Sequence, residues 1–540
     1  MPGMMISETF GTEIFEPLIK RASSLCCVDN SSPNYGSFDR DFWAYRTIRG
    51  FQSGPFQHVM AGFAYLSRIP VRENKSIYLE FAESSLSQWI KQRNLNGSAN
   101  EWYRNEQSFC ATAMGLHSAT ESLLLIRTLA DPKFLDCSSK SLASSERWLR
   151  GRTNHLASNQ VVAAACGRWN LGALLDDKHM QITAESVFKT LINDFDRQGF
   201  LMEYGGFDFG YSLISLDLLV STHRAGCDVI LPLVDRICGQ LMSLLSRGGD
   251  LPFALGSRGT HHRFFGGAHY FAGFSQDASH LVHRLKSDSW SERIKFFMSY
   301  DDRYFATFAF SAANRLLAFE NNVDTKVDLE FNSSDTNKLS PLRREDVSGG
   351  TLFCNSKLGS GVQFLTNEGE SFVHLGYSVQ FEGEQWCSLS VPKEKSAHGV
   401  HQFVKQSFST PLKRFSLLFE ILQSLCRVPW IARKVSLWAR MKIGRSTDTC
   451  PVFLTRSIEF NDETVSIVDL IHSSSEKGFQ RIQPLLMFPF YSPSLFNAPE
   501  INFVGPLFDS EEFRLSMKSI SIKWNINVQT MQMTSNVEFL

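Results

Sequence analysis

The sequence predicts a multidomain α+β protein, in which a ring-like array of paired helices at residues 1–330 precedes an antiparallel β-sandwich at residues 331–540. Apolar residues recur with helical spacing from about residue 54 to residue 320. A polar, turn-rich stretch at 322–350 is typical of a domain boundary. After it the apolar period changes to two, as in strands with one buried face. A chain of 540 residues also exceeds one ordinary core.

Each predicted helix gathers its apolar residues on one side. The segment 76–92 does so with Phe81 and Trp89, and 107–128 does so with Leu116 and Leu123. Further helical runs are expected at 155–177, 180–195, 209–226, 229–246 and 304–319. The helices recur as pairs roughly 45 to 55 residues apart, and paired helices in series bury their core between neighbours, as a ring or a solenoid does.

The C-terminal part has the signature of strands. Short β-branched or aromatic segments bounded by turn residues lie at 351–356, 360–366, 371–379 and 452–460. Val465 and Ile467 alternate with polar neighbours, as do Ile520, Ile522 and Trp524. Frequent turns with this alternation favour an antiparallel sandwich.

A segment at 411–445 interrupts the strands and has helical character. It carries eight Lys or Arg residues and a single acid, Glu420, interleaved with apolar residues such as Trp430 and Trp438. Such a basic amphipathic helix can lie on an anionic membrane surface or bind acidic sugar chains. It can equally cover the sandwich with its basic residues solvated, because ordinary packing also produces amphipathic helices.

Composition excludes several classes of function. The net charge of -1 gives no general attraction for nucleic acid. The 11 cysteines contain no CxxC pair, so a zinc ribbon is not indicated and a reducing compartment is expected. The N-terminus has no signal-peptide pattern, and no long uncharged apolar window occurs. We therefore expect a cytoplasmic protein without a cofactor, possessing neither a P-loop nor a GxSxG elbow.

Two polar stretches carry candidate ligand-binding groups in the first half of the helical part. At 35–57, Arg40 and Arg46 lie among aromatic residues, where they can bind acidic sugars or simply staple the N-terminal arm. At 153–170, Asn154 and His155 are expected to open a helix that Thr153 caps. There they can face a ligand at the end of the domain, or serve as a second cap and a buried histidine.

Two further stretches lie later in the helical part. At 200–219, Glu203, Tyr204, Asp208 and Tyr211 surround glycines that permit a tight loop, either as a site or as a structural turn. At 256–273, basic residues gather in a loop that suits an anion: Arg258, His261 and His262. The histidine spacing there lacks the i, i+4 pattern of a metal site on a helix, so we expect no metal.

The combination resembles the heparinase II/III-like polysaccharide lyases, which have an (α/α) toroid followed by a β-sandwich. The resemblance covers most of the chain in architecture. In letters it rests on TNH at 153–155, EYGGFDFGY at 203–211 and LTRSIEFNDETVSIVDLI at 454–471. The last is similar to the family's strand pair, in which an Arg-bearing strand precedes a strand ending in Asp. YGSFDRDFWAYR also looks like proteins of surface-polysaccharide synthesis with similar architecture.

The resemblance implies β-elimination at a uronic acid of an acidic polysaccharide. Asn154 and His155 would hold the sugar carboxylate, and Tyr204 or Tyr211 would be the base or the acid. Arg258 and His262 can add positive charge. Because Glu203 and Asp208 would repel a carboxylated sugar, and because no secretion signal is visible, a role in polysaccharide synthesis or modification is expected rather than degradation.

Three alternatives remain open at the level of sequence. The first is uronyl C5-epimerisation, which shares the abstraction of the C5 proton. The second is a glycoside hydrolase in which Glu203 and Asp208 form an acid/base pair. The third is a non-catalytic glycan-binding or assembly protein that the 411–445 segment holds peripherally at the inner membrane face.

Overall fold

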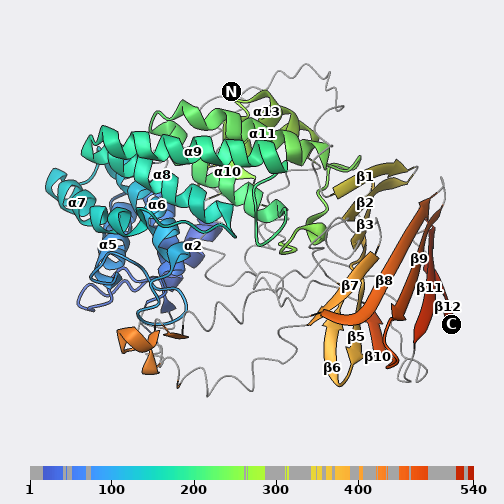
Figure 1. The fold of residues 1–540 in the computed structure, drawn as a ribbon. Coiled ribbons are helices and arrows are strands. Elements are labelled where there is room, and N and C mark those ends of the chain that lie inside the picture. Colours follow the sequence, from blue (N-terminus) through green and yellow to red (C-terminus); the bar gives the residue numbers. More distant parts are fainter. Residues whose placement is uncertain are drawn as a thin grey trace.

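The structure is a computed structural model. It describes residues 16–40, 44, 52–68, 75–260, 263, 265–285, 311, 313–314, 342–347, 349–355, 361–367, 371–388, 400–405, 421, 424–432, 434–435, 449–460, 464–484, 518–527 and 533–539. Helices occupy the N-terminal part and antiparallel strands the C-terminal part (Figure 1). The expected boundary at 330/331 lies outside the described residues.

The helices alternate between an inner and an outer row. The inner row packs in the order α4 (Met60–Leu66), α6 (Phe109–Ile126), α8 (Ser158–Leu175), α10 (Phe209–Arg224) and α12 (Gly266–Phe271). The outer helices are α5 (Lys75–Gln92), α7 (Pro132–Leu149), α9 (Lys178–Gln198), α11 (Leu231–Ser243) and α13 (Gln276–Arg284). Successive inner helices begin about 50 residues apart, which confirms the predicted pairing.

The described residues of this part also form α2 (Glu16–Leu25), η2 (Gly54–Val59), η3 (Asp228–Ile230) and η4 (Phe253–Leu255).

The burial of the two rows follows from their sequences. Outer helix α9 buries one stripe at helical spacing, which includes Ala184, Phe188 and Phe195. Inner helix α6 is buried on nearly all sides and has the length and hydropathy of a membrane-crossing segment, but 78% of that window is buried inside the protein. Among the described helices it is the one with this character.

One helix, α7, was not predicted, and one predicted helix begins later than expected. Helix α7 begins at Pro132, because the Asp131 carboxylate accepts the Lys133 N–H at 2.7 Å and Pro132 fits the first turn. The helix expected from residue 155 begins at Ser158. Thr153 therefore caps nothing there, and Asn154 lies in the preceding loop. The helix expected at 304–319 is described only at 311, 313 and 314.

The strands form two antiparallel sheets within the described residues. The smaller sheet has the order β1 (Leu342–Val347), β2 (Gly350–Asn355), β3 (Gly361–Thr366) and β4 (Ser371–His374). The larger sheet has the order β10 (Gln480–Pro484), β5 (Tyr377–Phe381), β6 (Glu384–Cys387), β7 (Val400–Lys405), β8 (Thr449–Phe460), β9 (Thr464–Ser473), β11 (Ser519–Asn527) and β12 (Met533–Phe539).

The segment 371–379, expected as one strand, is divided between the two sheets. Gly376 adopts a φ of 112°, a conformation open to glycine but not to most residues, and there the chain leaves β4 and enters β5. In β9 and β11 the buried and exposed residues alternate as predicted.

The smaller sheet lies between the helices and the larger sheet. Phe353, Leu365 and Val373 belong to the helical core, whereas Leu352 and Phe364, on the opposite face, belong to the core shared with the larger sheet. Alternation along β2 and β3 produces these two faces. Hydrogen bonds fix the first contact: the Arg247 N–H donates to Thr351 Oγ1 at 3.0 Å, and the Asn355 amide donates to the Leu255 carbonyl at 2.8 Å.

Candidate functional site

Two loops that precede inner helices run side by side. Ala157, before α8, forms a β-bridge with Glu203, before α10. The Tyr204 N–H donates to the Leu156 carbonyl, and the Ser158 N–H donates to the Met202 carbonyl at 2.9 Å. The loop containing Asn154 is thereby fixed against the loop containing Tyr204.

A third loop, between η4 and α12, joins them. The Ser257 hydroxyl donates to the Glu203 carbonyl, and the Ser257 N–H donates to the Phe207 carbonyl at 2.6 Å. The neighbouring Arg258 N–H donates to Asp208 at 3.0 Å. The predicted stretches 153–170, 200–219 and 256–273 therefore meet beside the N-terminal ends of α8 and α10.

Side chains from all three loops form one chain of contacts, here called the Tyr204 cluster: Asn154, Gln160, Tyr204 and Arg258. The Asn154 amide donates to Gln160 Oε1 at 2.9 Å, and Gln160 Nε2 donates to the Tyr204 hydroxyl at 3.3 Å. The Arg258 guanidinium lies 4.4 Å from the centre of the Tyr204 ring, within cation–π range. A cation, a phenol and two amides are thus assembled in one place.

The Tyr204 backbone is held in an uncommon conformation. Its φ is 50° and that of Gly205 is 91°. A non-glycine residue in the left-handed region is strained and persists where its surroundings over-determine it. Here the hydrogen bond from the Tyr204 N–H to the Leu156 carbonyl and the ring contact with Arg258 provide that constraint.

Glu203 is completely buried and supports the start of α8. Helix α8 lacks a side-chain cap at Ala157, and Glu203 Oε1 accepts the Asn159 N–H at 2.7 Å in its place. A carboxyl at a helix N-terminus satisfies a donor that the helix itself leaves open. Burial raises the pKa of Glu203 well above its ordinary value. With its side chain 0% exposed, Glu203 offers no surface to a sugar.

Asp208 is also 0% exposed and is the N-cap of α10. It accepts the Tyr211 N–H at 3.1 Å, the Arg258 N–H and the Thr260 hydroxyl. A Cβ at Gly256 would come within 2.7 Å of its carboxylate, so glycine is required for this close approach. Burial raises the pKa of Asp208. Neither carboxyl forms the open pair that a hydrolase needs.

The remaining predicted residues lie around or outside this cluster. His155 is exposed on the turn next to Asn154. Tyr211 is half-buried in the first turn of α10. Arg40 is exposed on the N-terminal segment, where Asp39 is buried and accepts the Ser53 N–H at 3.0 Å. Arg46, His261 and His262 lie outside the described residues.

Two contributors to the site were missed from sequence. Gln160 was not among the predicted site residues, although it links Asn154 to Tyr204. Glu101 lies in the α5–α6 loop and acts electrostatically on Tyr204. The signal available was the polar run NEWYRNEQS between two apolar helices.

The Tyr204 phenol is a protonated group at neutral pH. Burial raises its pKa above the ordinary value, and Cys110, Glu203 and Glu101 act in the same direction, whereas Arg258 opposes them. A neutral phenol close to a guanidinium can donate a proton while the cation attracts an anionic ligand.

The strand pair that resembles the lyase family forms a second buried polar cluster. Arg456 on β8 lies directly opposite Asp469 on β9, with Nε–Oδ1 and Nη2–Oδ2 distances of 2.6 and 2.7 Å. The Tyr377 hydroxyl donates to Asp469 at 2.7 Å and accepts the Trp524 indole N–H at 2.8 Å. His374 contacts the same guanidinium. All of these side chains are buried, so the cluster organises the interior of the strands.

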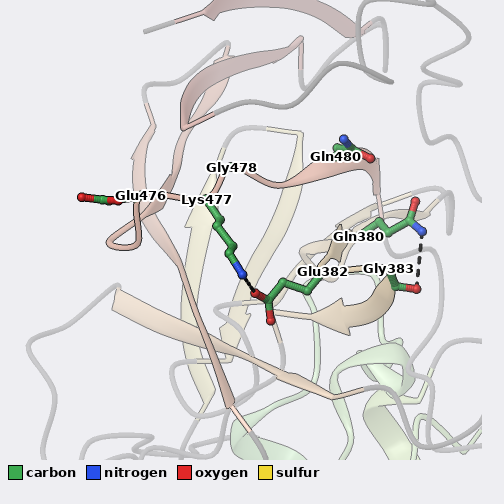
Figure 2. Close-up of a pocket in the computed structure, with 7 residues that line it drawn as sticks. All are labelled: Gln380, Glu382, Gly383, Glu476, Lys477, Gly478 and Gln480. Carbon is green, nitrogen blue, oxygen red and sulfur yellow. Dashed lines mark hydrogen bonds and ion pairs between the residues drawn. The ribbon is translucent and has the colours of Figure 1, made fainter.

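A polar pocket of about 390 Å³ lies at the turns of the larger sheet (Figure 2). Its lining residues include Gln380, Gln480 and an ion pair between Lys477 and Glu382. No predicted site residue lines it. Within the described part of the chain no group of three His, Cys, Asp or Glu residues could hold a metal ion.

The function of the chain is inferred from the geometry of this site. No family model matches the chain, and no curated protein matches it significantly.

Proposed function

We propose that this chain acts on acidic polysaccharide by β-elimination at a uronic acid. We further propose that its helical rows close into an (α/α) toroid and that its sheets form a β-sandwich, as in the heparinase II/III-like lyases. The observation that carries the proposal is the Tyr204 cluster, because it unites Asn154, Tyr204 and Arg258 from three separate loops.

The proposed roles follow the charges of the cluster. Arg258, with Asn154 and the exposed His155, neutralises the sugar carboxylate and stabilises the negative charge that develops when the C5 proton is removed. Tyr211 accepts that proton, a double bond forms between C4 and C5, and the C4–O bond breaks. Tyr204, which keeps its proton at neutral pH because burial raises its pKa, protonates the leaving oxygen.

The sequence alone suggests that Glu203 and Asp208 would repel an acidic sugar, but their burial weakens this objection. Glu203 and Asp208 are buried, and burial raises the pKa of both, so their repulsion of an anionic sugar is weakened. Because both carboxyl groups are buried, they do not form the acid/base pair that a glycoside hydrolase needs. Epimerisation at C5 remains the chemical neighbour, since it needs the same proton abstraction. The proposed setting is polysaccharide synthesis or modification in the cytoplasm.

The test uses the purified full chain and a panel of uronate polymers. Elimination produces an unsaturated sugar that absorbs in the ultraviolet, and epimerisation is followed by deuterium uptake at C5 from heavy water. Tyr204→Phe should abolish elimination, whereas Tyr78→Phe, a half-buried tyrosine on α5, should leave it unchanged. If neither absorbance nor deuterium uptake occurs on any polymer, the proposed activity is refuted.

A further inference from the structure

The segment between β7 and β8 packs on the helical part of the protein. Asn105, in the α5–α6 loop, donates hydrogen bonds to the carbonyls of Cys426 and Arg427 at 3.1 and 3.2 Å. Tyr103 packs with the buried Cys426 and Ala432. In Figure 1 these helical turns, in orange, lie beside the blue helices and away from the strands that flank them in sequence. The described part of the 411–445 segment therefore does not cover the sandwich.

The described residues of this segment also expose large apolar side chains. The exposed fractions are 50% for Ile421, 46% for Leu425, 41% for Val428 and 62% for Trp430. Ile421 and Leu425 are four residues apart, so they share one helix face. Four large apolar side chains exposed within ten residues form a candidate interaction surface.

Basic side chains accompany these apolar residues. Arg427 and Lys434 are exposed, and the Lys434 ammonium lies 5.5 Å from the centre of the Trp430 ring. The wider segment 411–445 holds eight Lys or Arg residues against one Glu. We call the set Ile421, Leu425, Arg427, Val428, Trp430 and Lys434 the insert face.

We infer that the insert face docks on an anionic membrane surface. Apolar and tryptophan side chains enter the boundary between headgroups and acyl chains, while adjacent Lys and Arg residues contact anionic headgroups. An acidic sugar chain matches the charge, but it has no apolar phase to receive Ile421 and Leu425. Tyr103 and Asn105 hold the segment on the helical part, so the insert face is fixed to the surface of the protein.

This inference is independent of the proposed elimination reaction. The insert face shares no residue with the Tyr204 cluster, so vesicle binding and polymer cleavage can fail separately. Docking would place the helical part beside the bilayer and would bring the protein to polymers made at that surface.

The test is sedimentation of the full chain with phosphatidylcholine vesicles, prepared with and without phosphatidylglycerol. The protein should pellet with the anionic vesicles, and added salt should release it. Ile421→Glu combined with Trp430→Glu should return it to the supernatant. Arg427→Gln with Lys434→Gln should weaken binding about 30-fold, since each basic residue near an anionic surface contributes roughly fivefold.

The matched control is Ile182→Glu, which changes an isoleucine that is 64% exposed on α9. It should bind as the unaltered protein does, and circular dichroism should show that every variant is folded. Recovery of the unaltered protein in the supernatant with anionic vesicles overturns the inference. Equal binding by the Ile421/Trp430 variant, or pelleting without vesicles through self-association, overturns it as well.

Discussion

Replacing Asp469 by Leu should destabilise the strand part strongly. The change leaves the Arg456 guanidinium, which is fully buried, without the carboxylate that it contacts at 2.6 Å. Removal of one partner from a buried ion pair costs about 3–5 kcal/mol, because the remaining charge is desolvated without compensation. Tyr377 also loses the acceptor of its hydroxyl proton. The free energy of unfolding, measured by urea titration, should fall by that amount.

The double variant Arg456→Met, Asp469→Leu tests the cause. With both charges absent, no uncompensated ion remains, so the double variant should be more stable than either single variant. If the two single effects simply add, or if Asp469→Leu unfolds at the same urea concentration as the unaltered protein, then the pair does not hold the strands in the way described.

The same pair gives an acid dependence of defined sign. Burial disfavours the ionised carboxylate, but the charge and hydrogen bonds of Arg456, with His374, outweigh it and hold the pKa of Asp469 well below its usual range. A group with a depressed native pKa stabilises the fold at pH values above its unfolded pKa of about 4, and this stability is lost as the pH falls through the native pKa. Asp469→Leu should flatten the acid side of a stability profile.

Three further outcomes are expected. Tyr204→Phe should keep the ring contact with Arg258 and the thermal stability within about 1 kcal/mol, since one weak hydrogen bond is lost, while activity disappears. Asp208→Ala should lower the free energy of unfolding by at least about 1–2 kcal/mol, because the cap of α10 is lost; an unchanged melting temperature would contradict this. Burial raises the pKa of Glu121 to about 8, so stability should decline as the pH rises from about 4.5 towards 8, by up to roughly 1.4 kcal/mol per pH unit. Glu121→Gln should remove that decline in thermal melts at several pH values.

Periodic segments of the fold were predictable from the sequence. Helix α5 lies within one residue of the expected range, and strand β11 contains the alternating residues Ile520, Ile522 and Trp524, because a continuous apolar face defines each element. Helix α7 escaped prediction, since Asp131-Pro132 serves equally as a break and as a helix start. Residues 371–379 divide into two strands because each half pairs with a different sheet. Pairing with distant strands cannot be seen in the local sequence, where Gly376 is the sign of the break.

The sequence indicated which loops contribute to the site, but it did not indicate the role of each residue in them. Clusters of polar and glycine residues marked Asn154, Tyr204 and Arg258, and the structure joins them. Burial of Glu203 and Asp208 was not readable from sequence, because the same carboxyl group can face a ligand or cap a helix. The role of Gln160 depends on the bridge between residues 157 and 203, a contact between distant parts of the chain.

The segment between β7 and β8 has a consequence for how the chain is assembled. Val404 pairs with Thr449, so the chain returns to its starting point in the sheet after a long excursion to the helical part. Asn105 leaves the ribosome 321 residues before Cys426, and N-terminal regions generally fold first during synthesis. The surface around Asn105 can therefore fold before the segment that packs on it has been synthesised. A strand part expressed alone would complete its sheet with the apolar side of this segment uncovered, so separate expression of the two parts invites aggregation.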